Sequence, residues 1–228
     1  MTGWLDQDTN TRAKVTFRSW CAREFKQGSS FSSKDLDRLI EQGNLLKHDR
    51  TTSVACLAIG VEEVIIKRYN PRSQWHRLSR AVRPSRASRC WHMSYEFQQA
   101  GLSVARPLLM LERRLGPLRR SAYFISEALN GVELLSALPS MPPCEQRAVG
   151  VAVNSAFENM AKARLSHGDL KASNLIWHNG HLYFIDLDAA RHHSSKQSWQ
   201  KANRKDRQRF LKNWQEAQHL LGLFKDLK

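Results

Sequence analysis

One segment of the sequence, SHGDLKASNLIWHNGHLYFIDLDAA (166–190), gathers polar and acidic residues into two clusters around a stretch that alternates like a β-hairpin. The first cluster holds Asp169, Lys171 and Asn174, and the second begins at Asp186. Phosphoryl transfer needs a carboxylate that accepts the proton of an attacking hydroxyl, a cation near the γ-phosphate and hard oxygen ligands for Mg²⁺. Asp169 and Lys171 are therefore the predicted catalytic residues, and Asn174 and Asp186 are the predicted metal ligands.

Each of these residues also has a structural interpretation when it is taken alone. Asp169 is able to cap a turn, and Asn174 is able to satisfy the backbone groups of a loop. Their joint spacing, followed by the sequence IDLD, favours the catalytic interpretation. We expect His167 to hold the loop by hydrogen bonds, because Asp169 is better placed to act as the base.

The elements that must position these groups follow from hydrophobic periodicity. In the first half, two apolar, β-branched stretches at 53–59 and 64–66 predict a hairpin, and a helical composition over 85–102 follows them. Further strands are predicted at 107–116 and 121–129. The first half is therefore predicted to be rich in β-strands.

The second half has helical periodicity instead. A helix predicted over 144–165 leads directly into the polar segment. Beyond residue 190, Phe210 and Trp214 belong to an apolar stripe at helical spacing, which we interpret as core packing. A chain of 228 residues with 41% hydrophobic residues is able to form one large domain or two small lobes.

Charge and cysteine content limit the class of partner and compartment. Lysine and arginine number 36 against 21 acids, for a net charge of +15, which favours a polyanionic partner: nucleic acid, an anionic membrane or a phosphorylated substrate. The four cysteines form no CxxC pair, so we expect a reducing cytoplasm and neither a zinc site nor a disulfide framework. The sequence also has no signal-peptide h-region and no apolar run long enough to span a bilayer.

The motif HGDLKASN resembles the H-x-D-L-x-x-x-N catalytic loop of the protein-kinase-like superfamily, and FIDLD stands in the place of its metal-binding D-F-G. The resemblance implies an α+β, two-lobed fold with a β-rich N-lobe, a mainly helical C-lobe and ATP between them. Lys67, in EVIIKRY, takes the position of the lysine in V-A-I-K, although alone it would be a strand-end lysine reaching solvent. Glu127 and Leu129, in FISEALNGVELL, complete the predicted cofactor-binding set.

Together with these motifs, the stretch SRASRCWHMSYEFQQAGLSVARPLLMLERRLGPL resembles the lipopolysaccharide kinases of the Kdo/WaaP type, especially their InaA-like branch. The resemblance implies ATP- and Mg²⁺-dependent phosphorylation of a heptose or Kdo sugar in the inner core of lipopolysaccharide. It also implies a Gram-negative source and a cytoplasmic protein peripheral to the inner membrane. The predicted organisation is an N-terminal extension over 1–44, an N-lobe over 45–129 and a C-lobe over 130–228.

Departures from the superfamily pattern leave some assignments open. No G-x-G-x-x-G precedes Lys67, and the corresponding turn, at 47–53, lacks glycine but offers backbone N–H groups and hydroxyls to phosphates. Glu96 and Glu112 are both candidates to pair with Lys67. Gly168 replaces the arginine with which regulated protein kinases bind a phosphorylated activation loop, which favours a small or carbohydrate acceptor while a protein substrate stays open.

Arginine recurs at every third position from residue 77 to residue 89, at Arg77, Arg80, Arg83, Arg86 and Arg89. Cations crowded without intervening acids repel one another, and an anionic partner removes that repulsion. We expect this ladder to contact lipid A phosphates or the headgroups of the anionic inner membrane, and nucleic acid is the disfavoured partner.

Two other classes of function remain as alternatives. A compact Bud32-like serine/threonine protein kinase would be similarly small and basic, but such kinases normally carry D-F-G where Leu187 and Asp188 stand here. A pseudokinase or nucleic-acid-binding scaffold would use only the basic surface. The presence of Lys67, Asp169 and Asp186 argues against the scaffold, which needs none of them.

Overall fold

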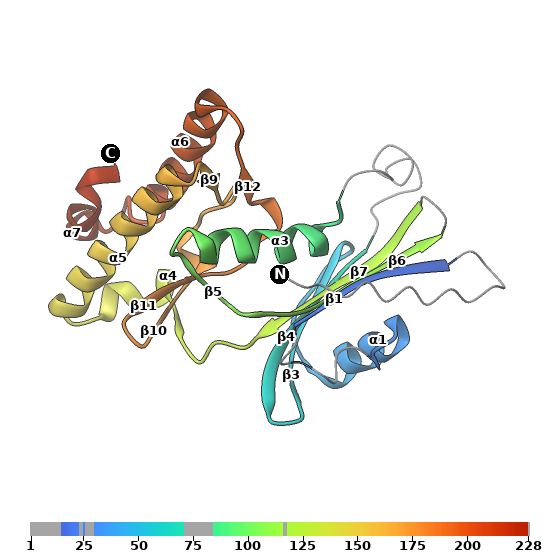
Figure 1. Ribbon diagram of the computed structural model, residues 1–228. Coiled ribbons are helices and arrows are strands. Elements are labelled where there is room, and N and C mark those ends of the chain that lie inside the picture. The colour runs from blue at the N-terminus through green and yellow to red at the C-terminus, as the bar shows by residue number, and fades with distance from the viewer. Residues whose placement is uncertain (1–14, 23–24, 26–29, 71–83, 116–117, 228) are drawn as a thin grey trace. The chain divides into compact units, whose positions relative to one another are not determined.

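The structure is a computed structural model, and it describes residues 15–22, 25, 30–70, 84–115 and 118–227 (Figure 1). Contacts divide the chain into two compact units. The first comprises Met1–Trp91 and Arg106–Ala128, and the second comprises His92–Ala105 and Leu129–Lys228. The chain therefore crosses the boundary three times: within helix α3 (Arg86–Gln99), between Ala105 and Arg106, and just after strand β7 (Leu118–Glu127).

A six-stranded antiparallel sheet forms the first unit, with the order β1-β6-β7-β4-β3-β2. Its strands are β1 (Val15–Cys21), β2 (Asn44–His48), β3 (Thr52–Ile59), β4 (Glu62–Tyr69), β6 (Pro107–Leu115) and β7 (Leu118–Glu127). The β3–β4 hairpin and the strands β6 and β7 confirm the strands predicted from the apolar stretches of the first half.

Helix α1 (Ser33–Gln42) contributes to the core of this unit. Leu36 and Ile40, one turn apart, are buried among side chains of the sheet because residues four positions apart share one face of a helix. Asp37 accepts a hydrogen bond from the Tyr123 hydroxyl at 2.7 Å and pairs with Arg68 at 3.1 Å, which ties the helix to β7 and β4. Both α1 and β1 come from the segment expected to be an extension, and the predicted lobe boundaries stay a prediction.

The second unit contains most of the helices that the structure describes. A four-stranded sheet has the order β5-β11-β10-β8, and a two-stranded sheet pairs β12 with β9. The strands are β5 (Ser103–Val104), β8 (Val132–Glu133), β9 (Leu165–Ser166), β10 (Leu175–His178), β11 (His181–Phe184) and β12 (Arg191–His192). The helices wholly within this unit are α4 (Leu134–Ala137), α5 (Pro143–Lys162), α6 (Lys196–Lys212) and α7 (Gln218–Leu221), with 3-10 turns at Leu138–Ser140, Ala172–Asn174, Leu187–Ala189 and Gly222–Leu227.

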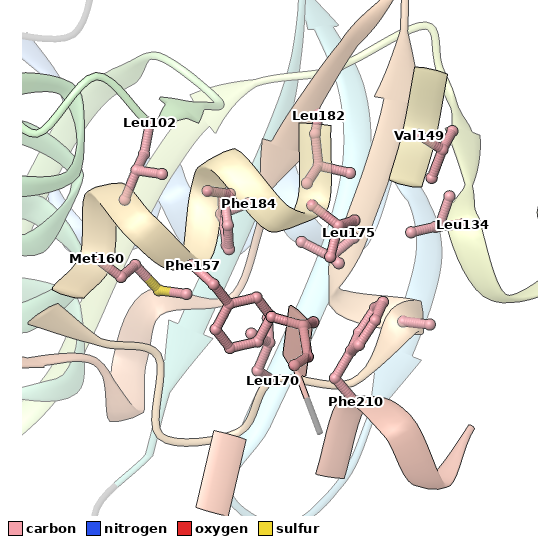
Figure 2. Close-up of a cluster of buried hydrophobic side chains, with 14 of the residues drawn as sticks. Leu102, Leu134, Val149, Phe157, Met160, Leu170, Leu175, Leu182, Phe184 and Phe210 are labelled. Carbon is pink, nitrogen blue, oxygen red and sulfur yellow. The ribbon is translucent and has the colours of Figure 1, made fainter. Parts of the chain in front are cut away.

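Helix α5 provides much of the core of the second unit, and its position in the chain confirms the helix predicted over 144–165. Val149, Val153, Phe157 and Met160 recur at helical spacing and are all buried. Figure 2 labels Val149, Phe157 and Met160 in this core. The apolar stripe predicted near the C-terminal end also lies in this core, although it is not one helix. Helix α6 ends at Lys212, and the chain turns before α7 begins at Gln218.

Candidate active site

A β-hairpin brings the two predicted metal ligands to the same end of two paired strands. Strands β10 and β11 pair in register from Leu175 with Phe184, and the two-residue turn Asn179–Gly180 connects them. Both turn residues have positive φ angles, 49° and 76°, as a type I′ hairpin turn requires. Beyond the last strand pair, the Ile185 N–H donates to the Asn174 carbonyl at 3.0 Å, so Asn174 and Asp186 lie at the foot of the hairpin.

The loop before the hairpin carries the predicted catalytic residues. Asn174 Nδ2 donates to the Asp169 carbonyl at 2.8 Å, and this leaves the amide oxygen of Asn174 as its potential metal ligand. The Asp169 carboxylate lies between two cations: Oδ2 is 3.2 Å from Lys171 Nζ, and Oδ1 is 3.5 Å from Arg209 Nε. Asp169, Lys171 and Asn174 are thus brought together as their spacing in the sequence predicted.

His167 holds this loop from inside the protein, since its side chain is fully buried. Its Nε2 lies 3.0 Å from the Ile185 carbonyl and its Nδ1 lies 3.4 Å from the Asp169 N–H. The neutral tautomer with a proton on Nε2 satisfies both contacts, because Nε2 then donates and Nδ1 accepts. Burial lowers the pKa of His167, which favours the neutral ring. Because both ring nitrogens contact backbone groups inside the protein, the ring is placed to hold the loop and not to act as a base.

Gly168 occupies a place in the loop that only glycine fits. Its φ is +81°, and an added Cβ would come within 2.5 Å of the Ala189 carbonyl oxygen. The backbone of Gly168 is held instead by polar partners: its N–H donates to Asp206, and its carbonyl accepts from Arg209 Nη1 at 2.6 Å. The glycine in HGD is therefore a steric requirement of this loop.

One face of helix α6 supplies these partners. Asp206, Arg209 and Asn213 follow one another at intervals of three and four residues, the first two within α6 and the third at its C-terminal cap, so they share a face. Asp206, which is 1% exposed, accepts the N–H of His167 at 2.8 Å and that of Gly168 at 3.1 Å. Asn213 Oδ1 accepts the Ala172 N–H at 2.9 Å.

Asp206, Arg209 and the cap residue Asn213 were not identified from the sequence, although a signal for one of them was present. Helix α6 carries seven lysines and arginines and a single acid, Asp206. A lone acid at the position that faces the apolar side of such a helix, one turn before Phe210, indicates a buried acceptor with a specific partner. The loop is also held by Leu170, which is 1% exposed and lies in the core near Phe157 (Figure 2).

In the first unit, Lys67 lies on β4, where it pairs in register with Val54 on one side and Phe124 on the other. Glu127, the last residue of β7, accepts the Arg106 N–H at 2.8 Å and forms an ion pair with the Arg106 guanidinium. Leu129 is half-buried and belongs to the second unit, whose longer segment begins at this residue. The assignment of Lys67, Glu127 and Leu129 to the nucleotide stays a prediction.

The two glutamates considered as partners of Lys67 each have another partner. Glu112 is 3% exposed and accepts a hydrogen bond from Arg114 Nε. Glu96 lies in the part of α3 that belongs to the second unit, and its carboxylate is 3.6 Å from His192 Nδ1. A pairing of either glutamate with Lys67 stays a prediction.

The turn predicted to cover the phosphates is organised around its own acid. The Asp49 carboxylate accepts the N–H groups of Thr51 at 2.7 Å and Thr52 at 2.9 Å, together with the Thr51 hydroxyl at 2.8 Å. These hydrogen bonds hold the pKa of Asp49 well below its usual range. The donors that were expected to face phosphates are thus bound to a carboxylate within the turn.

The sequence profile of the lipopolysaccharide kinase (Kdo/WaaP) family matches residues 33–220 of the chain. The chain belongs to this family. A solved structure described as "WaaP in complex with acyl carrier protein" is similar in fold, with a TM-score of 0.64 and 18% sequence identity over 85% of this chain and 80% of that one. No curated protein matches this sequence.

Membership of the lipopolysaccharide kinase family makes this chain an ATP-dependent phosphotransferase. The similarity to WaaP confirms the kinase-like α+β fold, with a β-rich N-terminal region and a helical C-terminal region. These results confirm the family, the fold and the enzyme class that the motifs predicted.

The metal site expected in this lipopolysaccharide kinase consists of few protein ligands. Among the residues that the structure describes, no group of three or more His, Cys, Asp or Glu side chains is arranged to hold a metal ion. The pair Asn174 and Asp186 nevertheless fits Mg²⁺, which keeps several waters and takes one or two protein oxygens together with substrate phosphates. His193 is no ligand candidate, because its ring nitrogens contact the hydroxyls of Ser166 and Ser198, each at 2.8 Å.

Proposed function

We propose that this lipopolysaccharide kinase transfers the γ-phosphoryl group of ATP to a hydroxyl of a heptose or Kdo sugar in the inner core. The observation that carries the proposal is the catalytic loop, in which Asp169 and Lys171 lie 3.2 Å apart next to the Asn174 amide. This loop combines a proton acceptor, a cation and an oxygen ligand, the groups that phosphoryl transfer to a hydroxyl requires.

Each residue has a role in the proposed reaction. Asp169 orients the acceptor hydroxyl and accepts its proton, while Lys171 turns its ammonium group towards the transferred phosphoryl group. Asn174 and Asp186 hold Mg²⁺, which neutralises charge on the phosphates when it is bound. Lys67 contacts the α- and β-phosphates, and the segment with Glu127 and Leu129 binds the rest of the nucleotide.

The direct test is phosphorylation of purified inner-core oligosaccharide by the purified protein with ATP and Mg²⁺, followed by mass spectrometry. We expect a mass increase of one phosphate, and we expect Asp169→Asn and Asp186→Asn to abolish it while circular dichroism stays unchanged. Comparing an acceptor that ends in Kdo with one that carries heptose assigns the sugar. Near-normal turnover in either variant contradicts the mechanism, and a parent protein that modifies neither acceptor contradicts the function.

An anionic bilayer is the partner that we propose for the outer face of α6. Lys201, Arg204, Lys205 and Lys212 share one exposed side of this helix, opposite the buried Phe210, and the one acid of the helix is buried. Each such cation contributes about 1 kcal/mol near an anionic surface. None of the helices that the structure describes has the length and apolar composition to cross a bilayer. We therefore propose a cytoplasmic protein attached to the face of the inner membrane.

The arginine ladder contributes less to this proposal than the sequence indicated. Arg77, Arg80 and Arg83 lie outside the described residues. Arg86 donates to the Thr52 hydroxyl at 3.1 Å, and its guanidinium lies 4.7 Å from the centre of the Tyr69 ring. At least this arginine is engaged within the protein and is not available as a freely solvated charge.

A matched pair of charge reversals tests membrane binding. We expect Lys201→Glu/Lys205→Glu to weaken binding to vesicles containing phosphatidylglycerol by at least about tenfold. The control, Lys34→Glu/Arg38→Glu on α1, makes the same change of charge with the same spacing on exposed residues of another helix. Equal losses in both variants would indicate a general charge effect and contradict a specific role for α6.

Acyl carrier protein is a candidate protein partner, because the structure of the related WaaP is a complex with it. We expect acyl carrier protein to co-purify with this chain and to dissociate from it on dilution or at high salt. Absence of a complex at micromolar concentrations of both proteins contradicts it.

A further inference from the structure

We propose that Arg209 is a positioning residue that sets the orientation of the Asp169 carboxylate during phosphoryl transfer. The proposal rests on the proposed function, because it assigns to Asp169 the role of proton acceptor. Arg209 lies in the last turn of α6, 40 positions after Asp169 in the sequence, and no motif of the sequence includes it.

The guanidinium of Arg209 contacts two consecutive residues of the catalytic loop. Its Nη1 donates to the Gly168 carbonyl at 2.6 Å, and its Nε lies 3.5 Å from Asp169 Oδ1. Because the guanidinium is planar and rigid, these two contacts fix the carboxylate relative to the peptide group that precedes it. A single point charge would attract the carboxylate without setting its direction.

Lys171 is not able to do the same work throughout the reaction. Its ammonium group lies 3.2 Å from Asp169 Oδ2, but Lys171 is an exposed residue of the same loop and has the proposed role of contacting the transferred phosphoryl group. When Lys171 turns to the phosphate, Oδ2 becomes available to the acceptor hydroxyl. Arg209, which comes from a different element, then keeps Oδ1 in place.

Helix α6 holds Arg209 in a fixed position relative to the catalytic loop. Asp206, one turn earlier on the same face, accepts the N–H groups of His167 and Gly168, so both polar backbone groups of Gly168 are bonded to α6. Gly168 has no side chain with which to pack, and the N–H and carbonyl contacts must define its position. The Arg209 contact therefore completes the link between the helix and the catalytic carboxylate.

The competing interpretation is that Arg209 and Asp169 form an ion pair that only stabilises the fold. The solvent exposure of the two side chains distinguishes this interpretation from a positioning role. The side chains of Arg209 and Asp169 are 40% and 37% exposed, and ion pairs between partly exposed groups contribute little to stability. Loss of Arg209 is therefore expected to leave the melting temperature nearly unchanged. Its effect on the reaction is expected to be large, because misplacement of a reacting group by about 1 Å costs up to about 100-fold in rate.

The experiment compares Arg209→Ala, Arg209→Lys and Arg147→Ala with the parent protein, on soluble inner-core oligosaccharide. Arg147 is an exposed arginine of helix α5 in the same unit, so its removal controls for loss of one positive charge. We expect Arg209→Ala to lower kcat by about 10- to 100-fold with the KM values for ATP and acceptor within about threefold. Arg209→Lys keeps the positive charge but lacks the planar guanidinium that makes both contacts. We expect its kcat to lie between those of Arg209→Ala and the parent protein.

Added guanidinium chloride at low millimolar concentration is expected to raise the kcat of Arg209→Ala and to leave Arg147→Ala unchanged. The proposal is overturned if Arg209→Ala keeps kcat within about twofold of the parent while Asp169→Asn is inactive. It is also overturned if Arg209→Ala loses activity only in proportion to a fall in the folded fraction, with no rescue by lysine or guanidinium. A parent protein that phosphorylates no core acceptor overturns the proposed function instead.

Discussion

The catalytic loop and the β2–β3 turn are both short, polar segments with an aspartate that binds backbone N–H groups, yet they are held in opposite ways. The catalytic loop is held by Asp206, a buried residue of helix α6 that lies 38 to 39 residues further along the chain than the N–H groups it binds. In the turn, the aspartate is Asp49, which binds the N–H groups two and three residues after itself and is exposed to solvent. One segment depends on the tertiary fold, and the other organises itself.

This difference determines how well each segment is positioned relative to the core of the protein. A loop held by a distant helix keeps its shape only while that helix is packed, but its position relative to the core is then well defined. A turn held by its own side chain keeps its local shape in any context, but nothing in those bonds positions it against the rest of the protein. Four predictions test the comparison.

The largest effect is expected for Asp206→Ala. The change leaves the buried N–H group of His167 and the part-buried N–H group of Gly168 without their charged acceptor, which costs up to about 1–3 kcal/mol of the free energy of unfolding for each group. Urea denaturation measures this loss, and phosphotransfer is expected to fall with it. Asp206→Asn keeps an acceptor oxygen and serves as the milder control. An unchanged urea midpoint in Asp206→Ala would show that the loop does not depend on α6.

Gly168→Ala is expected to be the next most damaging change. The new methyl group meets the Ala189 carbonyl at 2.5 Å in a backbone conformation that alanine disfavours, so the loop must move. We expect a fall in kcat of at least about tenfold and a loss of about 1–3 kcal/mol in stability. Gly180→Ala, at the hairpin turn, has a similar φ but open space around it and is the matched control. Equal effects of the two changes would contradict the steric argument.

Acidification is expected to weaken the loop before it weakens the turn. The pKa of His167 is lowered by burial, so the unfolded chain binds the proton first, and stability is lost as the pH falls below about 6.5, by at most about 1.4 kcal/mol per pH unit. The pKa of Asp49 is lowered by its hydrogen bonds, so its contribution is lost only as the pH falls below about 4. Thermal melts from pH 7.5 to 5 check the first step.

The control for this pH series is His167→Gln, which retains a side-chain N–H and a carbonyl but does not titrate. The variant is expected to show a shallower pH dependence, with a remaining slope from His193, whose pKa is also lowered by burial. Identical slopes in the parent and the variant would show that His167 is not the titrating group.

The smallest effect is expected for Asp49→Ala. Removing this carboxylate frees the N–H groups of Thr51 and Thr52 and takes a negative charge from the turn predicted to cover the phosphates. We expect the KM for ATP to fall by about two- to fivefold, with little change in kcat or melting temperature. Asp49→Asn keeps an acceptor without the charge and separates the two causes. A KM that does not change in either variant would show that the turn does not contact ATP.

The parts of the site that were predictable from sequence are those whose residues lie close together in the chain. Asp169, Lys171 and Asn174 fall within six residues, and the alternating strands that follow reveal the hairpin that leads to Asp186. The supports of the loop were not predictable in this way. Arg209 belongs to no motif and lies in a helix so rich in cations that solvent exposure is the ordinary expectation.

The same reasoning explains which parts of the fold were missed. The β3–β4 hairpin and helix α5 have strong local periodicity, and both were predicted. Among the strands that the structure describes, β1 pairs with β6 alone, almost a hundred residues later, and no local pattern reveals such a partner. The break between α6 and α7 escaped detection because the apolar spacing continues across it.

The Asn179–Gly180 turn makes the β10–β11 hairpin a place where the chain can be lengthened without changing the separation of Asn174 and Asp186. The hydrogen bond from the Ile185 N–H to the Asn174 carbonyl fixes this separation at the foot of the hairpin. The turn lies at the other end of the hairpin and is exposed. Residues added in the turn extend the ribbon outward, while one residue added within a strand reverses the faces of all that follow in it. The turn is accordingly an insertion point for a short peptide tag or a fluorescent label that reports on the site from between its two proposed metal ligands.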